Sequence, residues 1–152
     1  MNKFQSIVCA IAISFCLAAV ASAQEKGIRA KDVPAPVIAA AAKAYPNARI
    51  VGWAREIDSG KTFYEAEMRE GQTKRDVAFM PDGTIDLVEE EIALAQVPAA
   101  VQDALKARYP RAVINQAERL TRGSEVQYEL HVGRAPKKEV VFTPDGKFVK
   151  EE

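Results

Sequence analysis

Cysteine is almost missing from this sequence of 152 residues, and its two copies, Cys9 and Cys16, both precede residue 24. If residues 1–23 are removed, as argued below, the remaining chain cannot form a disulfide, which excludes a disulfide-stapled scaffold. Histidine occurs once, at His131, and the sequence has no glycine-rich phosphate-binding loop. No apolar run reaches the roughly 20 residues that span a bilayer, so we expect no transmembrane anchor in the mature chain.

The first 23 residues have the pattern of a secretory signal peptide. Lys3 supplies a positive end, residues 7–20 form an apolar run, and Ala21-Ser22-Ala23 is a small-residue cleavage site. We therefore predict cleavage after Ala23 and a periplasmic or secreted protein. Loss of Lys3 leaves 20 basic and 21 acidic residues, with both signs interspersed along the sequence. Such a distribution has no concentration of positive charge of the kind that binds nucleic acid, so we expect no nucleic-acid partner.

The motifs of residues 33–91 recur, with substitutions, in residues 97–152. Tyr45-Pro46 returns as Tyr109-Pro110 at an offset of 64, and the Pro-Asp-Gly of 81–83 returns at 144–146 at an offset of 63. We divide the chain into a signal peptide (1–23), a polar leader (24–32), a first repeat (33–91), a connector (92–96) and a second repeat (97–152). The leader has no apolar periodicity, so we expect it to be poorly ordered.

The residue pattern of each repeat predicts one helix followed by strands. Val33, Val37, Ala41 and Tyr45 form a helical stripe that Pro46 ends, and residues 97–110 repeat it. Alternating apolar and polar residues over 62–69 and 126–132 predict half-buried antiparallel strands, with further strands before them and on both sides of each Pro-Asp-Gly turn. The fold class expected is α+β: two tandem repeats, each an N-terminal helix packed on a four-stranded antiparallel sheet.

The order and repetition of these motifs resemble the pattern of a known protein family. A helix ending in Tyr-Pro-x-Ala, a strand carrying Tyr-Glu and a Phe-x-Pro-Asp-Gly hairpin, all present twice behind a signal peptide, resemble the PepSY-like, β-lactamase-inhibitor-like family. The resemblance implies a small periplasmic or secreted protein with two helix-plus-four-strand repeats. The inhibitor that gives the comparison its name is stabilised by disulfides, which this mature chain lacks, and no inhibitor contact residue carries over.

No catalytic constellation is recognisable, so we predict a protein that is not an enzyme and has no cofactor and no metal site. Ser59 and Ser124 lie in predicted turns, and neither has a nucleophile-elbow sequence beside His131. Glu65 and Glu67 share a strand face, which by itself implies neither a cleft nor a raised pKa. We expect His131 to be an exposed strand histidine. The alternative kept open is a small-molecule or metal-binding envelope protein that uses His131 and nearby carboxylates in a cleft between the repeats.

Where the two copies differ, the first is mostly the more apolar. Alternation from Ile50 places Val51, Trp53, Phe63 and Met80 on the sheet face opposite the helix. We therefore predict a protein- or peptide-binding patch centred on Trp53 and Phe63. The competing interpretations are that the patch is buried against the second repeat or the leader, or that weak alternation misplaces Trp53. The corresponding residues of the second copy are Asn115, Ala117, Gln127 and Thr143.

Overall fold

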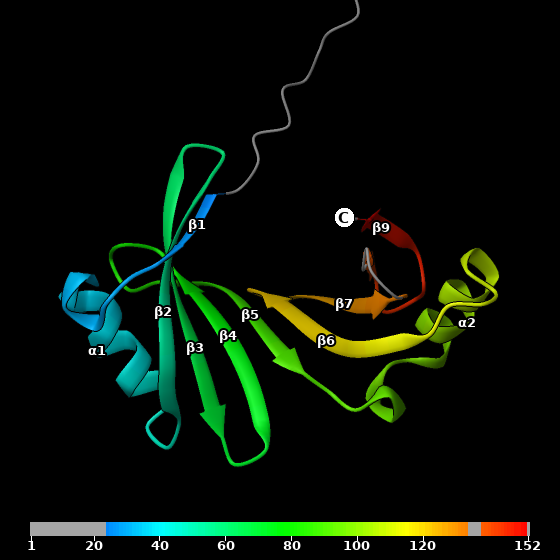
Figure 1. Ribbon diagram of the computed structural model, residues 1–152, viewed down its shortest axis with the longest axis horizontal. Coiled ribbons are helices and arrows are strands. Elements are labelled where there is room, and N and C mark those ends of the chain that lie inside the picture. The colour runs from blue at the N-terminus through cyan, green and yellow to red at the C-terminus, as the bar shows by residue number, and fades with distance from the viewer. Residues whose placement is uncertain (1–23, 134–137, 152) are drawn as a thin grey trace, which may run out of the picture.

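The computed structural model describes residues 24–133 and 138–151, so the predicted signal peptide lies outside the described residues. The described chain forms one nine-stranded antiparallel sheet in which every strand pairs with its neighbours in sequence, together with two helices and two short 3-10 turns (Figure 1). The strands are β1 (Gln24–Gly27), β2 (Arg49–Asp58), β3 (Lys61–Glu70), β4 (Thr73–Phe79), β5 (Ile85–Glu91), β6 (Ile114–Arg122), β7 (Glu125–Val132), β8 (Lys138–Phe142) and β9 (Phe148–Glu151).

The predicted fold class, two tandem repeats that each pack an N-terminal helix on a four-stranded antiparallel sheet, is wrong. Strands β5 and β6 pair along residues 88–91 and 118–121, which joins all the strands into a single sheet. Residues 24–27 add a ninth strand that the prediction assigned to a disordered leader. The residue pattern within one copy does not reveal that the last strand of the first copy bonds to the first strand of the second.

Proline precedes the first residue of each helix, and tyrosine follows the last. Helix α1 (Ala35–Ala44) and helix α2 (Ala99–Arg108) each begin after a proline and end at a tyrosine whose N–H still bonds to the carbonyl four residues back. A proline follows each of these tyrosines, and it cannot continue the helix because it has no N–H to donate. Each helix therefore has ten residues.

Both helices cover the same face of the sheet, called the helix face below. Val37 of α1 belongs to the apolar cluster that includes Val77 and Phe79, and Val101 of α2 belongs to the cluster with Val140 and Phe142. All six side chains are at most 1% exposed, and each contributes on the order of 1.5–3 kcal/mol through burial. Figure 1 shows the sheet curving between the helices, so that the opposite face lies on the inside of the curve.

Residues 24–32 are ordered, contrary to the expectation for the leader. Strand β1 pairs with β2, with Gly27 opposite Ala54, and the Ile28 N–H donates to the Trp53 carbonyl at 2.9 Å. The Ile28 side chain packs against the first apolar cluster. A polar strand is held here because its backbone finds partners along the edge of β2, which side-chain periodicity does not report.

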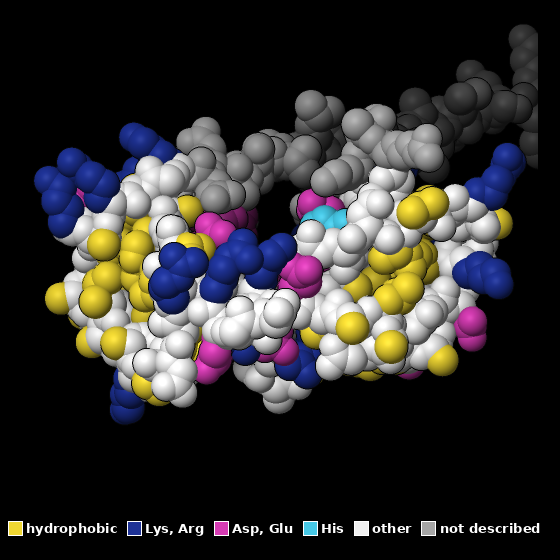
Figure 2. All heavy atoms as spheres, turned by 60° about the horizontal axis from the view of Figure 1, so that its bottom comes forward, with side chains coloured by type: hydrophobic (Ala, Val, Ile, Leu, Met, Phe, Trp, Pro, Cys, Tyr) yellow, Lys and Arg dark blue, Asp and Glu magenta, His cyan; other side chains and the backbone are white. Residues whose placement is uncertain are grey.

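Between the two apolar clusters, the helix face carries an ion-pair network. Arg75 Nη2 of β4 lies 2.5 Å from Glu90 Oε2 of β5, and Arg119 Nη2 of β6 lies 2.6 Å from Glu90 Oε1. Figure 2 shows charged side chains gathered between the two apolar areas. Glu90 thus ties the first copy to the second across the junction of the sheet.

The Pro-Asp-Gly turns lie against the first turns of the helices. Gly83 has a φ of +89°, and a Cβ atom there would lie 2.7 Å from the Pro36 carbonyl oxygen and 3.2 Å from the Ala40 Cβ. Glycine is needed for two reasons: the left-handed backbone, and the absence of space for a side chain. The turn therefore fixes the distance between the hairpin and α1.

Candidate binding face

The face opposite the helices carries carboxylates from six consecutive strands. Cross-strand partners share a face, and the register aligns Glu67, Asp76 and Glu89 in one row. A second row aligns Glu91, Glu118 and Glu129. We call this surface the acidic face and define it by Glu65, Glu67, Asp76, Glu89, Glu91, Glu118, Glu129 and Glu139.

Beneath these carboxylates the sheet is apolar. Leu120, next to Glu89 across the β5–β6 pair, is 8% exposed, and Val141, next to Glu129, is 1% exposed. A hollow of about 110 Å³ opens over Leu120 on this face. It is lined by Leu87, Glu89, Leu120, Arg122, Glu125, Gln127, Glu129 and Lys150.

Glu89 has a strongly raised pKa. Burial disfavours its charged form, and the neighbouring carboxylates, Glu129 first and Glu118 next, add repulsion, so that its pKa rises to about 8. At neutral pH the Glu89 carboxyl is therefore mostly protonated and can donate a hydrogen bond, which an ionised carboxylate cannot. The centre of the acidic face is a place where a further negative charge is strongly disfavoured.

Glu129 is perturbed in the same direction. Its burial raises its pKa, and repulsion from Glu139 raises it further, while the positive form of His131 opposes the shift. Because Glu129 raises the pKa of Glu89, the protonation of these two groups is linked. Any cation that binds here would displace such protons.

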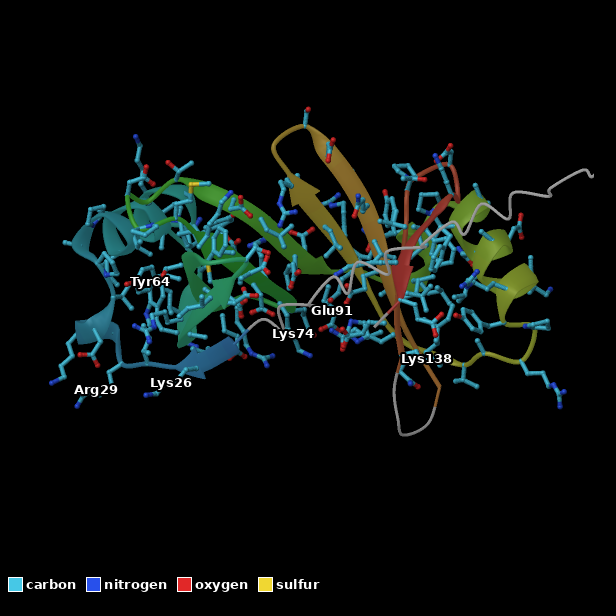
Figure 3. The ribbon with its side chains drawn as sticks, turned by 90° about the horizontal axis from the view of Figure 1, so that it is seen from above. Lys26, Arg29, Tyr64, Lys74, Glu91 and Lys138 are labelled. Carbon is cyan, nitrogen blue, oxygen red and sulfur yellow. The ribbon has the colours of Figure 1, made fainter. Side chains whose placement is uncertain are left out.

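Basic side chains lie toward the margins of this face. Lys74 Nζ is 2.9 Å from Glu91 Oε2, and Arg122 Nε is 3.2 Å from Asp86 Oδ2. Figure 3 shows Lys74 beside Glu91, with oxygen atoms of other side chains between these two residues and Lys138 of β8. The arrangement is a negative centre with a mixed rim.

The structure separates the four residues predicted to form an apolar patch. A β-bulge between Ile50 and Gly52 inserts one extra residue in β2, which turns Trp53 to the helix face, where it packs against the first apolar cluster. The placement predicted for Trp53 is therefore wrong, and the interpretation that weak alternation misplaces it is correct. The same bulge recurs between Ile114 and Gln116.

The other three predicted residues are dispersed. Phe63 pairs with Glu56 on the face opposite the helices and is half-buried. Val51 occupies the bulge and is 37% exposed, and Met80 follows β4 in the hairpin turn, where its N–H donates to the Thr84 carbonyl. They form no single patch with Trp53, and their role in protein binding stays a prediction.

His131 lies on the acidic face but is not the exposed histidine that the sequence predicts. Its side chain is 17% exposed, and its Nε2 lies 3.1 Å from Glu118 Oε2 and 3.0 Å from Glu129 Oε1. Its Nδ1 lies 3.4 Å from Glu139 Oε1. The alternation of β7 identified the correct face, whereas the carboxylates that β6 and β8 bring to the imidazole depend on pairings that the sequence did not reveal.

The chain is similar to known proteins. The model of the family described as "Putative beta-lactamase-inhibitor-like, PepSY-like" matches the chain twice, over residues 20–85 and 62–150. The chain belongs to this PepSY-like family. The resemblance stated from the repeated motifs is thereby confirmed. No curated protein matches the sequence.

Solved structures of Bacteroides proteins are similar to this PepSY-like chain. A "putative periplasmic" protein of Bacteroides eggerthii is 25% identical, with a TM-score of 0.66, over 79% of this chain and 88% of that one. A DUF2874 family protein of Bacteroides uniformis is 25% identical, with a TM-score of 0.65 and the same coverage of both chains. A BLIP-like protein of Bacteroides fragilis is 22% identical, with a TM-score of 0.61, over 78% and 85%, and this likeness shows the fold alone.

The helices of the described residues are too short or too polar to cross a bilayer. This finding concerns residues 24–133 and 138–151 and leaves the predicted signal peptide untested.

Proposed function

We propose that this PepSY-like protein is a non-enzymatic binding module of the cell envelope that binds a basic segment of a partner protein on its acidic face. The observation that carries the proposal is the crowding of carboxylates around Glu89, whose burial and carboxylate neighbours together raise its pKa to about 8. A protein that gathers like charges on an uncovered sheet face loses stability through their repulsion. Lysine or arginine side chains of a partner would remove that repulsion, so their binding free energy includes its relief.

The shape of the face supports a polypeptide ligand. The hollow of about 110 Å³ is well below the roughly 300–1,000 Å³ of pockets that enclose small molecules. It has an apolar floor at Leu87 and Leu120 and a charged rim. An extended segment with an aliphatic side chain between two basic ones fits this arrangement better than an enclosed cofactor does.

The family supports the periplasmic compartment and the absence of catalysis, and the predicted signal peptide supports the compartment. Two of the similar structures carry names that place them in the periplasm or liken them to the β-lactamase inhibitor, and the predicted cleavage after Ala23 would export this chain as well. Inhibition of an enzyme by the acidic face is one form that binding would take. The proposal requires only that a partner be held by charge and shape.

Calorimetry with a defined probe tests the proposal. A ten-residue peptide of alternating lysine and leucine should bind at low salt, weaken as salt is added, and weaken at least tenfold for Glu118→Gln combined with Glu91→Gln. Binding should release protons between pH 6 and 8, because the cation favours the ionised form of Glu89. Titration in two buffers of different ionisation enthalpy measures that release. A glutamate-leucine peptide of equal length is the control.

A second experiment addresses the natural partner. A photocrosslinking residue at Gln127, in the hollow, should give adducts in cells of the source organism, while the same residue at the exposed Asp103 of α2 should not. Equal adducts at the two positions, or a lysine-leucine peptide that binds the double variant as tightly as the native protein, would contradict the proposal.

A further inference from the structure

Glu118, Glu129 and His131 bring three metal-binding side chains together on adjacent strands. Glu118 of β6 pairs directly with Glu129 of β7, and His131 follows two positions later on the same face. One ligand atom from each lies within 4.8 Å of the others. The side chains are only 12%, 13% and 17% exposed, so this is a partly enclosed site rather than a group of solvated surface acids.

The contacts of the imidazole exceed what its protons can satisfy. Nε2 lies 3.1 Å from Glu118 Oε2 and 3.0 Å from Glu129 Oε1, but it carries at most one hydrogen, which can point at only one of them. Two carboxylate oxygens thus converge with a ring nitrogen on one point, and Glu139 adds a third negative charge nearby. A single imidazolium neutralises one of these charges.

The same distances match the spacing of ligands around a small divalent cation. Zinc binds nitrogen and carboxylate oxygen at about 2.0–2.1 Å, so two ligands at angles of about 90–109° lie roughly 2.8–3.4 Å apart. The two Nε2-to-oxygen distances, 3.0 and 3.1 Å, lie in that range. Insertion of a cation would therefore need deprotonation of Nε2 and only small movements of the side chains.

Neighbouring groups hold the ligands in orientation. The Gln116 side-chain N–H donates to Glu118 Oε1 at 2.6 Å, which leaves Glu118 Oε2 turned toward His131. On the other side of the ring, Nδ1 lies 3.4 Å from Glu139 Oε1. A carboxylate that accepts the Nδ1 proton leaves Nε2 free to bind a metal, which is the usual arrangement of metal-binding histidines.

We propose that Glu118, Glu129 and His131 bind a first-row divalent transition-metal ion, with His131 coordinating through Nε2. One nitrogen and two carboxylate oxygens suit Zn²⁺, whereas Ca²⁺ takes six to eight oxygen ligands. Three protein ligands leave a coordination position for water or for a side chain of another molecule. The site shares Glu118 and Glu129 with the acidic face, but metal binding does not require a bound peptide.

Zinc titration of the untagged full chain tests the site, with Cys9→Ser and Cys16→Ser in every sample so that no thiol binds the metal. Calorimetry should give one Zn²⁺ per chain, and His131→Ala, Glu118→Gln and Glu129→Gln should each weaken it at least tenfold. Glu67→Gln, on the same face but outside the three residues, should leave the affinity within about twofold. Ca²⁺ should bind at least tenfold more weakly than Zn²⁺.

The single histidine gives a second readout that does not depend on the stability of any variant. In the ¹⁵N spectrum of the imidazole, Zn²⁺ should shift Nε2 while Nδ1 keeps its proton, and Gln116→Ala should weaken this effect. No binding at 100 µM Zn²⁺, binding that leaves the imidazole resonances unchanged, or equal affinity after His131→Ala would each overturn the proposal.

Discussion

At the scale of single residues, the raised pKa of Glu89 links stability to pH. A carboxyl whose folded pKa is about 8 binds a proton more tightly in the native state than in the unfolded chain, where glutamate has its ordinary pKa of about 4.3. The native state therefore holds more protons between these values, and the free energy of unfolding falls as pH rises from about 4.5 to about 8. The loss continues until the native carboxyl has ionised.

Glu89→Gln should remove this dependence. Glutamine keeps the shape and the ability to donate a hydrogen bond but cannot ionise, so the variant should be more stable than the native protein at pH 9 by about 1–3 kcal/mol. Urea unfolding at pH 5, 7 and 9 measures the difference. Glu67→Gln, in the same row, is the control and should keep the native slope; a native protein whose stability does not fall from pH 5 to pH 8 would contradict the prediction.

Trp53 and Phe63 should differ in their contributions to stability. Trp53 packs against the first apolar cluster, so Trp53→Ala should cost about 2 kcal/mol, less than the 3–5 of a fully buried aromatic residue. Phe63, which lies on the opposite face, should cost about 1 kcal/mol or less when replaced by alanine. As the single tryptophan, Trp53 should emit at short wavelength and resist quenching by acrylamide. Red-shifted emission that is readily quenched would place Trp53 outside the core.

At the scale of elements, the hairpin after β4 is fixed to α1 by close contact. Gly83→Ala should destabilise the protein by about 2–3 kcal/mol, because the new Cβ meets the Pro36 carbonyl in addition to the cost of the positive φ. Gly71→Ala is the matched control: Gly71 has a φ of +58° but nothing within 4 Å of a Cβ, and should cost about 1 kcal/mol. Thermal unfolding compares the two, and equal losses would show that the contact with α1 is unimportant.

Local chemistry explains which elements the sequence could predict. Proline and tyrosine mark both helix ends, and the alternation around Tyr64 and Tyr128 places the strands, since these signals act within a few residues. The bulge beside Val51 has no such signal, because one extra residue changes the face of everything after it without changing composition. This is why the face of Trp53 was mispredicted while that of His131 was not.

The sequence predicted only part of the candidate site, for a related reason. Glu65 and Glu67 can be seen to share a strand face, and so can Glu129 and His131. The union of these pairs into one acidic face depends on the pairing of Glu91 with Glu118 across the junction of the copies. Long-range register of this kind is set by backbone bonding, which a single sequence does not encode locally.

At the scale of the whole molecule, the continuous sheet should make the two copies unfold together. Trp53 fluorescence reports on the first copy and far-ultraviolet circular dichroism on the whole chain, so their urea transitions should coincide in the native protein. Glu90→Ala removes the shared partner of Arg75 and Arg119 and should cost about 2 kcal/mol.

The exposed ion pair Arg122–Asp86 provides the control. Its arginine side chain is 62% exposed, so Arg122→Ala should cost no more than about 0.5 kcal/mol. Native transitions that already differ between the two probes, or a loss for Glu90→Ala no larger than that for Arg122→Ala, would show that the junction does not couple the copies.

An open sheet also has two outer strands, β1 and β9, whose outward backbone groups are available to other chains. Both have only four residues, and charged side chains such as Lys26 and Lys150 lie along them. Short, charged outer strands offer a poor template for stacking one molecule on the next, so the protein can keep a wide sheet in solution without growing into fibres.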